Sequence, residues 1–264
     1  MRTRFEGWPD EDVARSLERL ERWRDRVLDG AALQAGERVA DVGAGTGLLT
    51  LGAVDRVGPD GDVIALDISV DALEELRGQT RAPNISYLVG QADVLPLRDE
   101  SVDALVTRSV LIYVDDKAEA AREFARVLRS GGRVSLFEPI NSRNLKLAEA
   151  VDFGTLGELG ERVRVWNERS YATSDDPMLN FDETDLERHF RDAGLDVRLE
   201  LGATDEEIEG AQYLTQVGAP GRPAILARWR DEFTPDEVDV LVAFMEQRTI
   251  PSRVQHAFLT ARKP

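Results

Sequence analysis

The feature that most restricts the fold is an alternation of strand-like and helix-like segments between Arg38 and Glu138. Short runs rich in Val, Ile and Leu alternate with longer stretches of helical periodicity. The expected strands cover residues 38–42, 62–67, 85–89, 102–107 and 133–138, and the expected helices cover residues 46–57, 70–79 and 117–129. Strands that alternate with helices indicate βαβ units, whose parallel sheet is buried under helices on both faces. The sequence therefore predicts a doubly wound α/β fold.

The alternation stops after Glu138 and resumes at about residue 181, with a helix at 183–193 and a strand at 195–201. The intervening stretch has an irregular pattern with a helix near 145–156. A second irregular stretch contains a helix at 235–247, for which Thr234, Pro235 and Glu237 supply the N-cap, the first helical position and a capping box. A last strand is expected at 253–261, and residues 10–30 predict an amphipathic N-terminal helix.

A length of 264 residues suits one large domain with insertions or one domain with a small subdomain. We expect a single domain over residues 1–264 that consists of an N-terminal helical cap (1–35), a core (36–138), an insertion (139–180), the rest of the core (181–201 and 252–264) and a second insertion (202–251).

Composition excludes several classes of function. The 50 acidic against 33 basic residues give a net charge of −17, which repels nucleic acid, so no nucleic-acid partner is expected. The chain has no cysteine and only two histidines, so no metal site is expected. No apolar run approaches the roughly 18 residues of a membrane span, and the N-terminus lacks the apolar stretch of a signal peptide. We therefore expect no membrane partner and a cytoplasmic location.

The most informative motif is the run Val39-Ala40-Asp41-Val42-Gly43-Ala44-Gly45-Thr46-Gly47, in which a strand enters a glycine-rich turn before a helix. Such a turn is where α/β sheets bind nucleotide-like ligands. A dinucleotide fingerprint needs a third glycine where Leu48 stands, and a phosphate-binding loop needs a Gly-Lys pair, which the chain lacks. The acid at Asp41 would repel a pyrophosphate and suits a ligand with positive charge.

Two further acids follow the next two strands. Asp67 closes the second strand, where a carboxylate can accept hydrogen bonds from both hydroxyls of a ribose. Asp93, in the run Gly90–Val94 after the third strand, is placed to accept from an adenine amino group. Three strand ends thus converge on an adenosine-shaped ligand without phosphate.

Together these residues resemble those of the class I S-adenosylmethionine-dependent methyltransferases. The run 123–133, EFARVLRSGGR, resembles the small-molecule branch of that family, the methyltransferase type 11 or ubiquinone- and menaquinone-biosynthesis-like enzymes. The resemblance covers residues 36–138 well, and residues 181–201 and the last strand more loosely. It implies a Rossmann-like doubly wound, seven-stranded and mainly parallel sheet with an antiparallel last strand, to which helical cap insertions are added.

The resemblance also implies an enzyme with S-adenosylmethionine as cofactor, which transfers a methyl group to an O, N or C atom of a small-molecule acceptor. In that family the glycine loop meets the methionine part, the second-strand acid binds ribose, and the third-strand acid and the next backbone amide contact adenine. The cofactor-binding residues expected are Asp41, Gly43, Ala44, Gly45, Gly47, Asp67, Ile68, Asp93, Val94 and Arg108. Arg108 lies just past the fourth strand, where it either lines the pocket mouth or is a surface arginine. No catalytic residue can be assigned. Glu138 either orients the substrate or caps a turn, and His256 is either a general base or a packed strand residue.

The sequence lacks the motifs of the DNA methyltransferases, which points to a small-molecule acceptor. The run Thr107–Leu111 lacks the Asn/Asp-Pro-Pro-aromatic motif of amino-methylating DNA enzymes, and cytosine-C5 enzymes need a cysteine nucleophile that is absent. We expect the two insertions and the N-terminal helix to select the acceptor, and the insertions are also candidate surfaces for a homodimer. Arg164, Trp166 and Arg169 either form a substrate lid or lie on a solvated helix with one packed tryptophan.

Two other functions stay open. One is an S-adenosylmethionine-binding protein of this fold with a non-methylating activity, such as a cyclase, a decarboxylase or a regulatory binder. The other is a nicotinamide oxidoreductase, which Leu48 disfavours because a glycine is expected there.

Overall fold

The structure is a computed structural model that describes residues 10–172, 175–216 and 222–264. Residues 1–9, which belong to the expected N-terminal cap and to the stretch that lacks a signal-peptide pattern, lie outside the described part. The chain divides into two compact units. Unit 1 comprises Met1–Ile140, Phe181–Gly202 and His256–Pro264, and unit 2 comprises Asn141–Asn180 and Ala203–Gln255.

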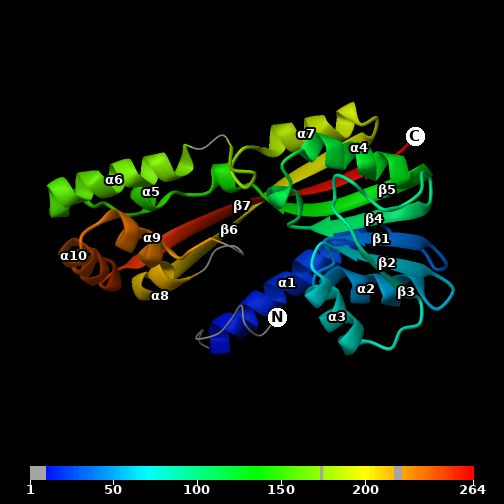
Figure 1. Cartoon of the computed structure of the whole chain (residues 1–264), viewed down its shortest axis with the longest axis horizontal. Helices are drawn as coiled ribbons and strands as arrows, with labels where there is room; N and C mark the ends of the chain where they lie inside the picture. The colour runs from blue at the N-terminus through cyan, green and yellow to red at the C-terminus, as the bar shows by residue number, and fades with distance from the viewer. Residues whose placement is uncertain (1–9, 173–174, 217–221) are drawn as a thin grey trace. The chain divides into compact units, whose positions relative to one another are not determined.

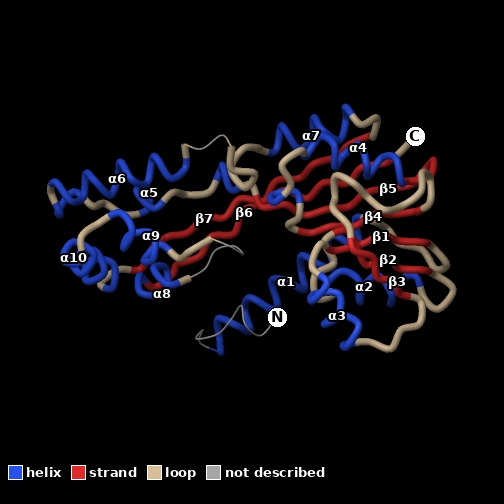
Figure 2. Tube along the Cα trace, viewed as in Figure 1, coloured by secondary structure: helices blue, strands red, loops and turns tan. Residues whose placement is uncertain are grey.

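In the described part of the chain, seven strands form one sheet in the order β3-β2-β1-β4-β5-β7-β6 (Figures 1 and 2). The strands are β1 (Arg38–Val42), β2 (Asp62–Asp67), β3 (Ile85–Val89), β4 (Val102–Arg108), β5 (Leu128–Pro139), β6 (Asp196–Glu209) and β7 (Thr249–Arg262). Strands β1 to β5 pair in parallel, and β7 runs antiparallel to β5. The expected mainly parallel sheet with an antiparallel last strand is confirmed.

Helices cover both faces of the sheet in unit 1. They are α1 (Asp10–Gly30), α2 (Leu48–Val57), α3 (Val70–Gln79), α4 (Lys117–Val127) and α7 (Glu183–Asp192). Helices α1, α2 and α3 pack on one face, where Val27, Leu49 and Val63 share one buried cluster, and α4 and α7 lie on the other (Figure 1). On that second face Phe124 of α4 meets Phe190 of α7 with ring centroids 5.9 Å apart. Burial on both faces explains why the strands read as continuous apolar runs.

Unit 2 is mainly helical and has its own apolar core. Its helices are η3 (Asn141–Arg143), α5 (Leu147–Ala150), η4 (Gly154–Leu156), α6 (Glu158–Tyr171), α8 (Gly210–Thr215), α9 (Ile225–Glu232) and α10 (Pro235–Glu246). Trp166 of α6 and Trp229 of α9 meet edge to face with centroids 6.1 Å apart in this core. The capping box at the start of α10 is present, since Thr234 Oγ1 accepts from the Glu237 N–H and Glu237 Oε2 accepts from the Thr234 N–H.

The expected helix near 145–156 is wrong. One short turn of helix ends at Ala150, and the long helix of this segment is α6, which begins at Glu158. Gly157 has φ +57°, a left-handed conformation that interrupts a helix and that glycine adopts at little cost. It separates η4 from α6, and the extended backbone of Val151 (φ −129°, ψ 124°) ends α5 before η4 begins.

Strand β6 is longer than expected and continues past residue 201 to Glu209. Its second half is rich in acids, which have low strand propensity, so the sequence pattern ended at Gly202. Gly202 lies inside this strand. A larger residue would not fit there, since a Cβ would lie 2.5 Å from Nε2 of His256. The glycine thus marks a close approach between β6 and the buried histidine of β7.

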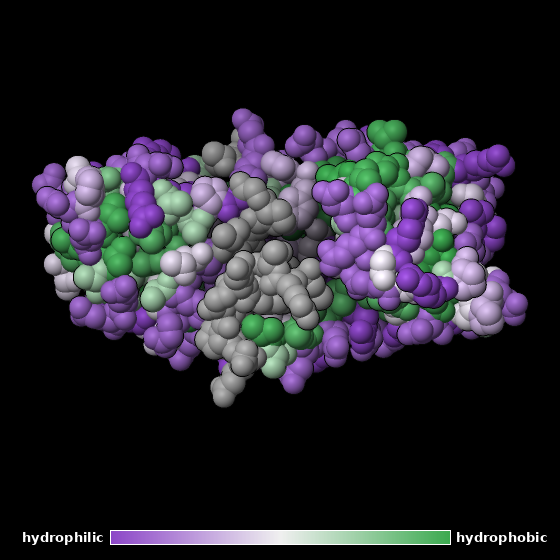
Figure 3. All heavy atoms as spheres, turned by 60° about the horizontal axis from the view of Figure 1, so that its bottom comes forward, coloured by the Kyte–Doolittle hydropathy of each residue, from purple (hydrophilic) through white to green (hydrophobic). Residues whose placement is uncertain are grey.

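The face shown in Figure 3 is mostly hydrophilic, with apolar residues in smaller groups. Among the described helices, none is long and apolar enough to cross a membrane.

Candidate functional site

The glycine-rich loop after β1 lies where the strand order reverses. Strand β1 has β2 on one side and β4 on the other, with Val42 opposite Leu66 and Thr107. The connections after β1 and β4 therefore leave toward opposite directions along the sheet, the arrangement that in open α/β sheets leaves a crevice at the carboxyl ends of the strands. Ligands of open α/β sheets bind in such a crevice.

Backbone hydrogen bonds hold the glycine loop against the end of β2. The N–H groups of Gly43 and Ala44 both donate to the Leu66 carbonyl, at 2.7 and 2.8 Å. The Gly45 N–H donates to Oδ2 of Asp67 at 2.7 Å. The structure thus brings the first and second expected contact regions together without a ligand.

The three glycines of the loop have different surroundings. Gly43, Gly45 and Gly47 all have positive φ, at +73°, +52° and +98°. A Cβ on Gly43 would lie 2.1 Å from a methyl of Val110, and one on Gly47 would lie 2.2 Å from a methyl of Leu76. At Gly45, by contrast, no atom of the described residues lies within 4 Å of such a Cβ. Gly45 is therefore the position where the loop backbone faces open space that a ligand can fill.

Asp67 is half-buried at the end of β2 and ties two loops together. Its Oδ2 accepts from the Gly45 N–H, and its Oδ1 accepts from the Ser69 N–H at 2.9 Å. An ionised carboxylate offers about four lone-pair positions, so each oxygen retains room for a further donor. The side chain can bind a pair of hydroxyls and still position the glycine loop.

Two apolar side chains stand exposed beside the acids of the second and third loops. Ile68 is 71% exposed and Val94 is 68% exposed, while Asp93 between β3 and β4 is half-buried. The Val94 N–H donates to the Gln91 carbonyl at 3.3 Å, so the turn itself uses this amide. Exposed branched side chains next to a carboxylate suit the faces of a planar base with a donor group at its edge.

Asp41, the acid of the glycine motif, is buried and only half satisfied. Its Oδ2 accepts from the Thr50 hydroxyl at 2.6 Å, whereas its Oδ1 has no hydrogen-bond partner among the described residues. Burial raises the pKa of Asp41 to about 7, and the neighbouring charge of Asp67 adds to the rise. The bond from Thr50 and the charge of Arg108 act in the opposite direction. A buried acceptor without a donor is destabilising, so this carboxylate suits a cationic or hydrogen-bond-donating ligand.

We expect Asp41→Asn to gain stability relative to the wild type as the pH rises. The folded-state pKa of about 7 lies above the ordinary 3.8, so the folded protein binds this proton more tightly than the unfolded chain. Wild-type stability from this group is complete below pH 3.8 and is lost as the pH rises through 7. The amide of Asn does not titrate. The difference in free energy of unfolding between wild type and Asp41→Asn should therefore change with pH by up to roughly 4 kcal/mol. Urea unfolding of both ligand-free proteins from pH 4 to 8 measures it, and a pH-independent difference would contradict the shift.

The turn after β4 forms the other side of the crevice. Arg108 is half-buried, its Nη1 donates to Ser109 Oγ at 3.3 Å, and its charge lowers the pKa of both Asp41 and Glu138. Ser109 has φ +56°, a conformation that costs a non-glycine residue about 1 kcal/mol or more. A residue keeps such a strained conformation only where contacts with its neighbours hold the backbone in place, so we infer that the turn at Ser109 is held by its surroundings.

Glu138 caps this turn. It accepts hydrogen bonds from the backbone N–H groups of Val110, Leu111 and Ile112, at 2.8, 3.0 and 3.3 Å. Burial raises the pKa of Glu138 to about 7 against the opposing effect of these three bonds. Of the two interpretations of Glu138, capping of a turn is the one that the hydrogen bonds support. Sequence reasoning missed Val110, because nothing in the local pattern signals its contact with Gly43.

The other candidates from the sequence, His256, Arg164 and Trp166, make packing contacts or ion pairs in the structure. His256 packs against the rings of Trp23, Phe137 and Phe258 in unit 1. In unit 2, Arg164 pairs with acids one turn away on its own helix at 2.5 and 2.6 Å, and Trp166 is buried. The interpretation of a solvated helix with one packed tryptophan is the one that these contacts support.

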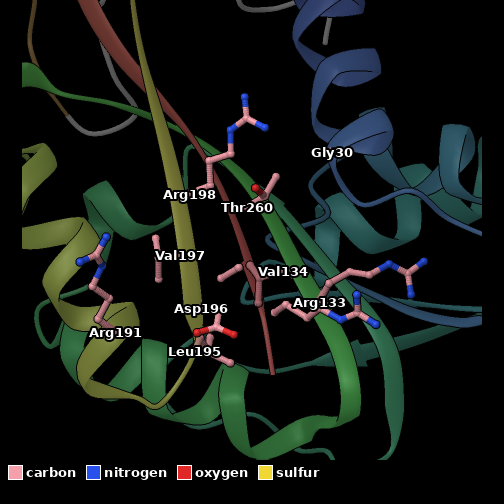
Figure 4. A pocket seen from close by; sticks show the side chains of 11 residues that line it. Gly30, Arg133, Val134, Arg191, Leu195, Asp196, Val197, Arg198 and Thr260 are labelled. Carbon is pink, nitrogen blue, oxygen red and sulfur yellow. The ribbon is translucent and has the colours of Figure 1, made fainter. Parts of the chain in front are cut away.

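A cavity of about 590 Å³ lies at the opposite edge of the sheet in unit 1 (Figure 4). Its lining is Gly30, Arg133, Val134, Arg191, Leu195, Asp196, Val197, Arg198, Thr260, Ala261 and Arg262. Arg133, Arg191 and Arg198 point in different directions (Figure 4), and each pairs with a glutamate, at 2.5, 2.6 and 2.8 Å. The guanidinium groups of Arg133, Arg191 and Arg198 therefore do not converge on one point of this cavity (Figure 4).

Comparisons with known proteins identify related sequences and structures. A family model described as a methyltransferase domain matches residues 40–136, which include the glycine loop, Asp67 and Asp93. The ubiquinone/menaquinone biosynthesis C-methyltransferase UbiE of Hahella chejuensis is 32% identical over 180 residues, which cover 66% of this chain and 72% of that protein.

Two solved structures share the fold. The [4+2]-cyclase SpnF superposes with a TM-score of 0.54 at 20% identity, over 92% of this chain and 80% of that chain. A geranyl diphosphate methyltransferase in complex with S-adenosylmethionine superposes with a TM-score of 0.53 at 16% identity, over 92% of this chain and 85% of that chain.

The strand order, the antiparallel β7 and the acidic glycine loop define a class I S-adenosylmethionine-dependent methyltransferase. The chain belongs to this family, in the small-molecule branch of the ubiquinone- and menaquinone-biosynthesis-like enzymes. It is an enzyme that transfers the methyl group of S-adenosylmethionine to a small-molecule acceptor.

Proposed function

We propose that the crevice of unit 1 binds S-adenosylmethionine through the loops after β1, β2 and β3, and that the acceptor atom is carbon. The observation that carries the cofactor assignment is Gly45, whose backbone faces open space while its N–H is held by Asp67. The name of the relative from Hahella chejuensis, a C-methyltransferase, supports a carbon acceptor.

The residues of the crevice fit the parts of this cofactor. In the proposal Gly43, Ala44, Gly45 and Gly47 surround the methionine part, and Asp67 accepts from the ribose hydroxyls. Ile68 and Val94 contact the faces of the adenine, and Asp93 accepts from its amino group. Asp41 with its open Oδ1 favours the positive charges of the ligand, and Arg108 lines the mouth of the crevice beside it.

When bound, S-adenosylmethionine supplies a methyl group that its positively charged sulfur makes electrophilic. The chain's own residues then have to orient the acceptor and exclude water, since alignment of reacting atoms can supply several kcal/mol of the barrier. Glu138 accepts from three backbone N–H groups of the turn after β4, and Asp41 accepts from Thr50 with Oδ2 while its Oδ1 has no partner among the described residues. We therefore assign them binding and positioning, not proton transfer.

Selection of the acceptor is proposed for residues 141–180 and 203–255, which cofactor binding does not require. Their own apolar core and paired surface charges support a stably folded unit. A homodimer through these segments, a cytoplasmic location and the absence of a nucleic-acid partner stay predictions from the sequence.

A second candidate is a non-methylating activity on the same cofactor site, because a cyclase shares this fold with a TM-score of 0.54. The two functions differ in whether the acceptor gains a label from methyl-labelled S-adenosylmethionine. A reaction that consumes the acceptor without transferring label would favour the second candidate.

We expect S-adenosylmethionine and S-adenosylhomocysteine to bind with micromolar affinity, about −8 kcal/mol. Isothermal titration calorimetry measures this, with NADH as the control ligand because Leu48 disfavours dinucleotide binding. Label transfer is then followed by mass spectrometry over a panel of quinols, phenols and amines. Absence of heat with both sulfur ligands, together with clear NADH binding, would overturn the cofactor assignment.

A further inference from the structure

The turn between β4 and α4 begins with N–H groups that have no cap of their own. Val110 is the N-cap position of the short helix η2 (Leu111–Tyr113), and its side chain makes no capping hydrogen bond. The first N–H groups of a helix lack partners within the helix and need an external acceptor when buried. Leu111 and Ile112 are buried, so the acceptor must come from the protein.

Glu138 supplies this acceptor from the end of β5. Its Oε1 receives two N–H groups, from Val110 and Leu111, and its Oε2 receives that of Ile112. The side chain is fully buried, and burial raises its pKa to about 7. The three N–H groups and the charge of Arg108 oppose that rise by favouring the ionised form. The ionised carboxylate accepts from three consecutive amides at once. Such charge-assisted hydrogen bonds are stronger than those between neutral groups.

The same turn contacts the glycine loop through one side chain. A methyl group of Val110 occupies the position 2.1 Å from where a Cβ of Gly43 would stand. The backbone before it is fixed as well, because the Ser109 N–H donates to the Phe137 carbonyl at 2.8 Å. Movement of the turn would therefore remove the support on one side of the loop.

We propose that Glu138 is a positioning residue for the cofactor, which acts through Val110 to hold the glycine loop in its binding conformation. The inference rests on the proposed function, since the loop is the part assigned to the methionine end of S-adenosylmethionine. Glu138 does not contact the ligand itself in this proposal. Its effect on affinity passes through the turn and the loop.

The test is a double-mutant cycle of Glu138→Gln and Val110→Ala, with S-adenosylhomocysteine affinity as the readout. Glutamine keeps one oxygen for two amides and loses the acceptor for Ile112, and alanine removes the methyl groups that contact Gly43. Each single variant should weaken binding by roughly tenfold. The double variant should bind S-adenosylhomocysteine about as tightly as the single variant with the lower affinity, because both changes break the same connection between Glu138 and the glycine loop. Multiplied effects, or unchanged affinity in both singles while the wild type binds, would overturn the proposal.

Ser135→Ala is the matched control. Ser135 is a buried polar residue of the same strand, but it faces Gly30 of α1 and not the turn. This variant should bind S-adenosylhomocysteine as the wild type does. A loss of affinity as large as that of Glu138→Gln would show a general effect of polar groups in β5 and would contradict a specific role of Glu138.

Hydrogen exchange of the ligand-free proteins provides a readout that does not depend on the cofactor. In Glu138→Gln the amides of residues 110–112 and of residues 43–45 should both exchange faster than in the wild type. Faster exchange at 110–112 alone would separate the turn from the loop and overturn the positioning role. If the wild type does not bind S-adenosylhomocysteine, the proposed function fails. Hydrogen exchange of the ligand-free proteins still tests whether Glu138 stabilises the glycine loop.

Discussion

Gly45→Ala is expected to weaken S-adenosylhomocysteine binding by roughly 10- to 100-fold while the protein stays folded. A Cβ at this position meets no atom of the described residues, so the cost in the folded protein is confined to the left-handed backbone, about 1 kcal/mol. The same Cβ would occupy the space in which we place the methionine part of the ligand. Calorimetry for affinity and urea unfolding for stability measure the two effects separately.

Gly58→Ala is the matched control for this change. Gly58 also has positive φ, at +67°, and a Cβ added there would meet no atom of the described residues within 4 Å, but it follows the far end of α2. A helix of ten residues is about 15 Å long, so this site lies away from the loop. The control should lose at least as much stability, because its ψ of −172° places Gly58 in a region that is almost confined to glycine, and it should keep wild-type affinity. Equal affinities for the Gly45 and Gly58 variants would show that the ligand does not approach Gly45.

Asp67→Ala is expected to reduce S-adenosylhomocysteine affinity by roughly 100-fold or more without unfolding the protein. The carboxylate is assigned to two ribose hydroxyls, and each hydrogen bond to a charged group contributes about 1.5–3 kcal/mol. The change also releases the Gly45 N–H, which loosens the glycine loop before any ligand binds. Both effects lower affinity, so the loss should exceed that of removing the ribose contact alone.

The control is Asp62→Ala, an acid at the opposite end of the same strand. Asp62 pairs with Arg38 on the surface, where an ion pair contributes at most about 1 kcal/mol. Its removal should leave affinity unchanged, as measured by calorimetry on the folded variant. Wild-type affinity in folded Asp67→Ala would place the ribose elsewhere.

Local sequence patterns were enough to predict the sheet of unit 1 and the position of the acids along its carboxyl edge. Both follow from local patterns, because apolar strands that alternate with helices form parallel βαβ units, and the ends of parallel strands share one edge. Asp41, Asp67 and Asp93 could therefore be grouped before any contact was known. Helix α10 was also predictable, since the capping box of Thr234 and Glu237 acts within a few residues.

The contacts between groups inside the site could not be predicted in this way, because they arise from packing. Val110 against Gly43, and Glu138 on the amides of the turn after β4, join segments far apart in the sequence. Such contacts depend on strand register and on the direction of each side chain, which local periodicity does not encode. The same holds for the raised pKa of Asp41, because burial and the neighbouring charges of Asp67 and Arg108 exist only in the folded chain. The candidate residues of the site could thus be predicted from the sequence, while their support and their protonation are properties of the packing.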